Sequence, residues 1–169
     1  MTAPLIVTAE LGPADLATLD SLRRRHFPPE RNRLAAHLTM FHAVPALLEP
    51  ELKQRLAAIA ASSPPPAATL AGLMDLGGGV ALRIISDDLE AIRDDLGEAF
   101  RGSLTQQDSH GWRPHVTIQN KVAPKVARAL LAELELGFEP RPLVIAGLAY
   151  HHYEGGPWRV GKRYAFRGK

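Results

Sequence analysis

The sequence His37-Leu38-Thr39-Met40 recurs in its pattern at His115-Val116-Thr117-Ile118. Each stretch is a histidine, an apolar residue, a threonine and a second apolar residue. Because successive side chains of a β-strand point to opposite faces, the histidine and threonine of each stretch share one face. The apolar residues point the other way, into a core. Two such strands lying side by side would present two imidazoles and two hydroxyls to one cleft.

Such a set of side chains is suited to a phosphate ester and needs no metal. One imidazole takes a proton while the other gives one, and the hydroxyls bind phosphate oxygens. An unperturbed imidazole pKa of about 6.5 lets two histidines hold opposite protonation states at neutral pH. We therefore expect His37 and His115 to be catalytic and Thr39 and Thr117 to bind phosphate. The sequence does not say which histidine is the base.

Length and composition predict one domain over residues 1–169. With 46% hydrophobic residues the chain can bury a substantial core. Since it contains no cysteine, disulfides, thiolate nucleophiles and cysteine-ligated zinc are excluded. No apolar run is long enough to span a bilayer, and residues 1–10 lack the pattern of a signal peptide. We therefore expect a cytoplasmic protein without a membrane partner.

The elements outside the two motifs alternate in a way that predicts an α+β fold. Strands are expected at 5–9, 34–44, 69–74, 80–85, 112–121, 143–150 and 158–166, and helices at 13–26, 49–61, 87–101 and 124–136. Residues 102–111 are expected to form a polar loop. The order motif strand, helix, strand, strand occurs at about 34–85 and again at about 112–166. This repeat predicts two lobes with mainly antiparallel sheets, helices outside and the active-site cleft between them.

Strand alternation also indicates candidate substrate-binding residues next to the motifs. In the first motif strand it places Phe41 with the site residues and His42 on the opposite, core face. In the second it places Arg113, Gln119 and Lys121 with the site residues. Phe41, Arg113, Gln119 and Lys121 are therefore possible substrate-binding residues. The basic run 23–26 is expected to be a solvated last helical turn, where cations suit the helix dipole.

These residues resemble the two-histidine (2H) phosphoesterase superfamily, and within it the bacterial 2′-5′ RNA ligase and RNA 2′,3′-cyclic phosphodiesterase-like proteins. The resemblance rests on residues 37–40 and 114–118 and on the order of strands and helices over nearly the whole chain. It implies a bilobal α+β fold and metal-free action on 2′,3′-cyclic phosphates or 2′-5′ phosphodiester bonds of RNA ends or nucleotides, with the ligase direction as the reverse reaction. Carried over, it makes His37 and His115 the acid/base pair and Thr39 and Thr117 the phosphate ligands.

One departure from the resemblance concerns the cation at the phosphate. Some relatives carry an arginine shortly after the second motif, where this chain has Gln119-Asn120-Lys121. Lys121 or Arg113 would then have to supply the charge.

The histidines have three other readings. One is structural, namely two partly buried strand histidines whose ring nitrogens are satisfied by hydrogen bonds. A metal site is not expected, because His37 and His42 fall on opposite faces of the predicted strand and no carboxylate lies at a ligand-like spacing. No cofactor is expected either. The alternative function is a non-catalytic module that binds a nucleotide or RNA end on the same fold. The mildly basic charge of +2 and the scattered cations favour a small substrate or an RNA end over a long nucleic-acid footprint. A monomer is the default expectation, because nothing in the sequence resembles a heptad seam.

Overall fold

The computed structural model describes residues 3–169, and within them eight strands form one sheet in the order β6-β3-β4-β5-β2-β1-β7-β8. Every neighbouring pair in the sheet is antiparallel. The strands are β1 (Leu5–Leu11), β2 (Leu38–Val44), β3 (Thr69–Asp75), β4 (Val80–Ile85), β5 (His115–Gln119), β6 (Arg141–Pro142), β7 (Ile145–Tyr153) and β8 (Trp158–Ala165). Met1 and Thr2, at the start of the segment 1–10, lie outside the described residues.

The helices are α1 (Pro13–His26), α2 (Glu49–Ser62), α3 (Asp87–Ala99), α4 (Gln106–Ser109) and α5 (Pro124–Glu135), with short 3-10 turns at Pro29–Arg31 and Ala46–Leu48. The expected α+β fold with antiparallel pairing is confirmed. Local rules explain several ends: α1, α2 and α5 each carry a proline in the first turn. The Ser86 side chain caps α3 by accepting from Leu89 N at 3.1 Å. The fold differs from expectation at α4, which lies in the predicted loop 102–111, at β2, which begins at Leu38 and not at residue 34, and at β6, which was not expected.

The sheet has two halves that meet between the motif strands. One half is β6-β3-β4-β5 and the other is β2-β1-β7-β8. In the described part of the chain β2 and β5 are joined by a single register pair, Leu38↔Val116. Each half therefore combines one motif strand with the hairpin that follows the other motif in sequence: β5 lies beside the β3–β4 hairpin, and β2 lies in the half that contains the β7–β8 hairpin. The internal repeat at 34–85 and 112–166 stays a prediction.

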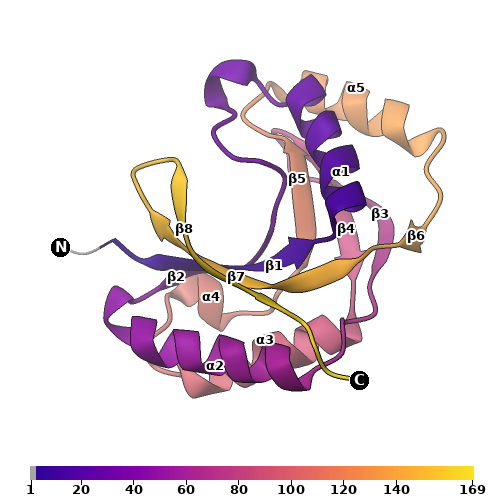
Figure 1. Ribbon diagram of the computed structural model, residues 1–169. Helices are drawn as coiled ribbons and strands as arrows, with labels where there is room; N and C mark the ends of the chain where they lie inside the picture. Colours follow the sequence, from indigo (N-terminus) through magenta and orange to yellow (C-terminus); the bar gives the residue numbers. More distant parts are fainter. Residues whose placement is uncertain (1–2) are drawn as a thin grey trace.

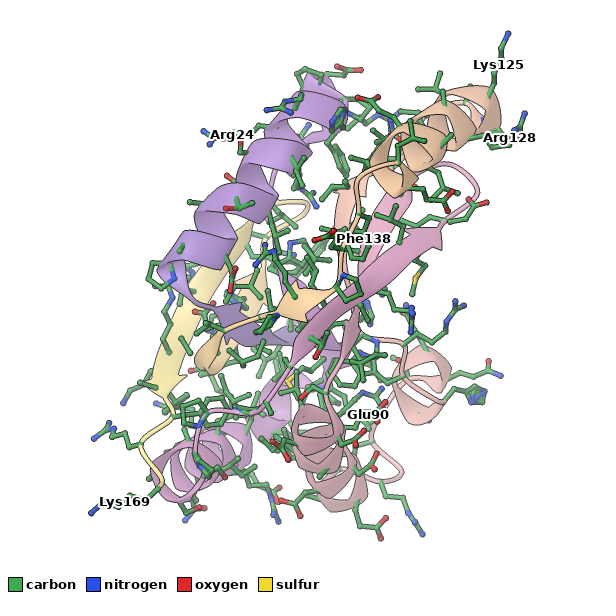
Figure 2. All side chains as sticks on the ribbon, turned by 90° about the vertical axis from the view of Figure 1, so that its right-hand side faces the viewer. Arg24, Glu90, Lys125, Arg128, Phe138 and Lys169 are labelled. Carbon is green, nitrogen blue, oxygen red and sulfur yellow. The ribbon has the colours of Figure 1, made fainter. Side chains whose placement is uncertain are left out.

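Helices cover the sheet on both sides of this junction, as Figure 1 shows. Helix α1 packs on β5 and α5 on β3 and β4, whereas α2 packs on β7 and β8. One cluster of buried side chains runs from β1 and β2 through α2 and α3 to β4 and β5. In Figure 2 the charged ends of Arg24, Lys125 and Arg128 point outward from α1 and α5, while Phe138 lies over the sheet between them.

None of the helices within residues 3–169 has both the length and the apolar composition that a bilayer crossing requires.

Candidate active site

The two motif histidines and the two motif threonines line one cavity of about 290 Å³ at the junction of the sheet halves. All four side chains are half-buried, and the apolar residues between them are fully buried. The alternation expected for His37-Leu38-Thr39-Met40 and for residues 115–118 is thus present in the structure.

The register between the motif strands explains how the four side chains meet. Leu38 pairs with Val116 in antiparallel orientation. Continued by one residue in each direction, that register sets His37 across from Thr117 and Thr39 across from His115. Each histidine therefore faces the threonine of the other motif.

Both histidine rings are held in the same way. His37 Nδ1 lies 2.8 Å from the Ala35 carbonyl oxygen, and His115 Nδ1 lies 2.7 Å from the Arg113 carbonyl oxygen. Because a carbonyl only accepts, Nδ1 carries the hydrogen in both rings. Nε2 is then the nitrogen through which each ring can exchange a proton in the cavity.

The surroundings of His37 disfavour its charged form. Burial lowers its pKa from 6.5 to about 4. The positive charge of Arg23 and the rings of His151 and His115 act in the same direction, and the Ala35 carbonyl acts against it. The imidazole of His37 is therefore neutral at pH 7.

Strand β2 is irregular just after Thr39, and this reverses two expectations. Thr39 pairs with Thr8 and Phe41 pairs with Val7, so two steps along β2 match one step along β1. Such a bulge shifts the alternation of side chains by one residue. Phe41 is consequently buried in the core at 0% exposure, and His42 lines the cavity with His37 and Thr39. Placing Phe41 at the site and His42 in the core was wrong, since strict alternation does not anticipate a bulge.

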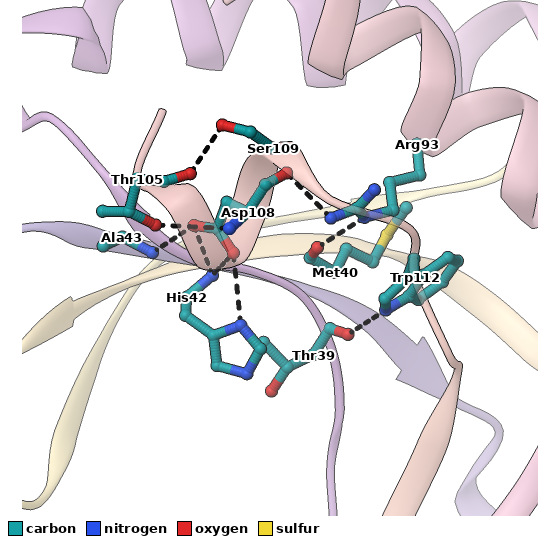
Figure 3. Close-up of polar contacts among 9 residues, drawn as sticks. All are labelled: Thr39, Met40, His42, Ala43, Arg93, Thr105, Asp108, Ser109 and Trp112. Atoms are coloured by element: carbon teal, nitrogen blue, oxygen red, sulfur yellow. Dashed lines mark hydrogen bonds and ion pairs between the residues drawn. The ribbon is translucent and has the colours of Figure 1, made fainter. Parts of the chain in front are cut away.

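A buried carboxylate holds His42. Asp108, on α4, accepts from the backbone N–H groups of His42 and Ala43 at 2.8–3.0 Å, and from His42 Nδ1 at 3.2 Å (Figure 3). These hydrogen bonds outweigh the effect of burial and lower the pKa of Asp108. Sequence reasoning missed this residue. The signal available was the spacing Thr105-x-x-Asp108, because the Thr105 hydroxyl caps α4 by accepting from Asp108 N at 3.3 Å.

Arg93 fastens α3 and α4 to β2. Its Nε donates to the Met40 carbonyl and its Nη2 to the Asp108 carbonyl, both at 3.0 Å. Its guanidinium also lies over the rings of Phe41, at 4.8 Å, and Trp112, at 5.4 Å. Trp112 in turn donates from Nε1 to the Thr39 carbonyl at 3.1 Å. The backbone of the first motif is therefore supported from behind by a charged side chain.

Arg23 serves the second motif in a similar way. It is buried, and it donates from Nη1 to the Thr117 carbonyl at 3.1 Å and from Nε to Asn32 Oδ1 at 2.8 Å. The expectation of a solvated turn was wrong for this residue, because α1 packs on β5 and turns Arg23 inward. Arg24 and Arg25 are exposed as expected.

The remaining possible substrate-binding residues have different positions. Arg113 is exposed and lines the cavity. Gln119 is buried, and its Oε1 has no hydrogen-bond partner in the described residues. The pairing of β5 with β4 shifts register between Thr117 and Gln119, so that Gln119 does not share the face of Thr117. Lys121 follows β5 in a turn with φ 62° and is not among the residues that line the cavity. Gln119 and Lys121 are thus not brought to the site.

His37 and His42 share the cavity, contrary to the expected opposite faces. Within residues 3–169 no group of three or more histidine, aspartate or glutamate side chains has an arrangement that could hold a metal ion.

Comparisons with known proteins agree with this fold. A family model described as the 2′-5′ RNA ligase superfamily matches residues 11–157. Comparison with curated proteins finds no match. Among solved structures, the chain is similar to TT0787 of Thermus thermophilus, with 15% identity, 98% of this chain and 99% of that chain covered, and a TM-score of 0.67.

Two structures of E. coli LigT are also similar to the chain. The complex with 3′-AMP has 19% identity and a TM-score of 0.60, with 98% of this chain and 99% of that chain covered. The complex with NADP+ has 17% identity and a TM-score of 0.60, with 99% of each chain covered. At these identities the likeness shows a shared fold.

Proposed function

The chain belongs to the 2′-5′ RNA ligase superfamily, whose members are two-histidine phosphoesterases, and we propose that it is a metal-independent phosphodiesterase. The bonds it would act on are those of 2′,3′-cyclic phosphates or the 2′-5′ linkages of nucleotides and RNA ends. The observation that carries the proposal is the shared cavity of both motifs, with each histidine anchored through Nδ1 to a carbonyl.

His37 is the base of the hydrolytic direction in this mechanism. Its lowered pKa of about 4 keeps Nε2 unprotonated at neutral pH, so that it can take a proton from water as the oxygen attacks phosphorus. The bond from phosphorus to the 2′ or 3′ oxygen then breaks. His115 gives a proton from Nε2 to the departing oxygen, and the product is a phosphomonoester with a free hydroxyl. With a 5′-hydroxyl in place of water as the nucleophile, the same attack forms the bond from phosphorus to the 5′ oxygen, breaks the bond to the 3′ oxygen, and leaves a 2′-5′ phosphodiester with a free 3′-hydroxyl.

The threonines hold the phosphate between the two rings. The hydroxyls of Thr39 and Thr117 donate to the non-bridging oxygens, on which negative charge grows as water adds.

The size of the cavity favours a small ligand. About 290 Å³ is at the lower end of volumes for small-molecule sites, which suits a nucleotide or the last nucleotide of an RNA. Trp112 and Trp158 line the cavity and offer ring faces for a base. The E. coli LigT structure with 3′-AMP supports a nucleotide ligand for a protein of this fold.

The test is hydrolysis of a nucleoside 2′,3′-cyclic phosphate in the presence of EDTA. Wild type, His37→Gln and His115→Gln are compared, with His110→Gln as the matched control, because His110 is exposed and lies outside the cavity of the two motifs. Loss of one acid/base group should lower kcat by roughly 10²–10⁴-fold, and the control should keep wild-type activity.

Three outcomes would count against parts of the proposal. Loss of wild-type activity in EDTA would reject the metal-free mechanism. Full activity of either motif variant would reject the acid/base pair. An inactive wild type that binds the nucleotide would favour the binding module over the enzyme.

A further inference from the structure

We infer that His42 is a third functional histidine of the cavity, whose Nε2–H binds a non-bridging phosphate oxygen beside the Thr39 hydroxyl and supplies positive charge there. The inference rests on the proposed function for its substrate, but the binding of phosphate that it requires can be measured without turnover. It assigns a role to a residue outside both motifs.

The bulge in β2 places His42 for this contact. Three residues along a regular strand would put Thr39 and His42 on opposite faces. The shifted register leaves both on the cavity side and sends Met40 and Phe41, each 0% exposed, into the core. In Figure 3 the Thr39 hydroxyl and the outer nitrogen of the His42 ring point to the same side. A phosphate bound by Thr39 would therefore lie within reach of His42.

Asp108 fixes the tautomer and the direction of the ring. Its carboxylate is 2% exposed and is already bound by the backbone N–H groups of His42 and Ala43. The contact of 3.2 Å to His42 Nδ1 puts the hydrogen on that nitrogen. When the ring is protonated, Nε2 also carries a hydrogen, and the charge is balanced by the carboxylate behind it. A buried carboxylate costs desolvation energy, and here it orients a side chain that is 46% exposed.

The other cations near the cavity are less suited to this position. Arg93 donates to the carbonyls of Met40 and Asp108, which directs its guanidinium to the backbone. Arg113 lines the cavity from the β5 side and is exposed, and Lys121 does not line it. His42, by contrast, is held beside a motif threonine by a buried carboxylate.

A charge at this position has a clear use during hydrolysis. When water adds to phosphorus, negative charge increases on the non-bridging oxygens before the leaving oxygen departs. An imidazolium that donates to one of these oxygens stabilises that state more than it stabilises the bound substrate. Removal of its charge should therefore lower kcat more than it raises KM.

The experiment uses two neutral replacements that divide the functions of the ring. His42→Asn keeps an N–H group near the position of Nδ1, where it can donate to Asp108, and has no atom at the position of Nε2. His42→Gln places a neutral amide nearer to Nε2. The dissociation constant of inorganic phosphate is measured by intrinsic fluorescence, because the only two tryptophans of the sequence, Trp112 and Trp158, both line the cavity. The kcat and KM for a nucleoside 2′,3′-cyclic phosphate are measured in parallel, with His110→Asn as control.

Phosphate affinity and kcat are expected to fall in the order wild type, His42→Gln, His42→Asn. The Asn variant should lose about tenfold or more in kcat, in keeping with one hydrogen bond to a charged group, and about fivefold or more in phosphate affinity. Thermal melting of each variant checks the fold. If His42→Gln fails to fold, the Asn variant alone provides the test, because it retains the contact to Asp108.

Two results would overturn the inference. One is phosphate affinity and kcat of His42→Asn within about twofold of wild type. The other is a raised KM for the nucleotide with unchanged phosphate affinity, which would mean that the ring contacts another part of the substrate. A wild type that binds phosphate through His42 and yet hydrolyses no cyclic phosphate would leave this inference standing and reject the proposed function.

Discussion

The indole of Trp158 meets the imidazole of His37 edge to face, with ring centroids 4.7 Å apart and planes inclined by 61°. Trp158 is the first residue of β8, at the outer edge of the sheet half that contains β2. It also lies 5.3 Å from the ring of His151. The β7–β8 hairpin therefore packs against one side of the proposed base.

The pH dependence of activity should reveal the neutral state of His37. Its pKa is lowered to about 4, and hydrolysis needs the unprotonated ring. The value of kcat/KM should therefore stay level down to about pH 5 and fall tenfold per pH unit once the pH is below about 4. Circular dichroism over the same range checks that the fold persists. An acidic limb near pH 6.5 would mean that His37 is not the base.

Substitution of Trp158 should move that limb. In Trp158→Ala water reaches the His37 ring, its pKa rises towards the ordinary value, and the acidic limb of kcat/KM moves to higher pH. Trp158→Phe keeps an aromatic edge and should move it less. The shift is read from pH–rate profiles of the three proteins. Identical limbs for wild type and the Ala variant would show that the indole does not control solvation of the base.

The same pKa predicts a stability effect. The unfolded chain binds a proton at His37 as the pH falls below 6.5, while the folded chain resists until about 4, so stability from this site is present above pH 6.5 and is lost as the pH falls to 4. At about 1.36 kcal/mol per pKa unit, His37 contributes up to about 3 kcal/mol to the free energy of unfolding above pH 6.5. Urea unfolding of His37→Gln at pH 7 and at pH 4 should show less loss on acidification than wild type shows.

The motif threonines should affect phosphate binding without affecting the fold. Thr39→Val and Thr117→Val keep the shape of the side chain and remove the hydroxyl. Each loses a hydrogen bond to a charged group, worth about 1.5–3 kcal/mol, and kcat/KM should fall roughly 10- to 100-fold. Thr69→Val is the control, because Thr69 is an exposed strand threonine of β3 outside the cavity. Equal effects of all three changes would refute the assignment.

Arg93 should be sensitive even to lysine. The ammonium of Arg93→Lys cannot donate in two directions along a planar fork or lie flat on Trp112. We expect a loss of about 3 kcal/mol in the free energy of unfolding, measured with urea, together with lower activity as α4 and His42 lose support. Arg101→Lys, just after the end of the same helix and 78% exposed, should change stability by less than about 0.5 kcal/mol.

Most of the fold was predictable because its determinants are local. Alternation of apolar and polar residues indicated the strands, and the order of strands and helices indicated the α+β class. The spacing of two similar motifs also identified the histidines and threonines that share the cavity. Each of these features can be read from a few neighbouring residues.

The parts that were missed depend on distant residues. The bulge that exchanges Phe41 and His42 arises from pairing with β1, which no pattern inside β2 reports. Asp108 is buried because α4 docks on β2, although a polar loop was the natural reading. The sequence does indicate that Arg93 is buried, because a residue four positions after Leu89 and three before Leu96 lies on the apolar face of α3.

The single pair Leu38↔Val116 that joins the sheet halves in the described chain has an evolutionary consequence. Each motif histidine is the residue immediately before one member of that pair, so the spacing of the two histidines is set where the halves touch. Mutations that tilt the outer strands would widen or narrow the mouth of the cavity and leave that spacing intact. Such an architecture permits descendants to acquire new substrates while inheriting one reaction.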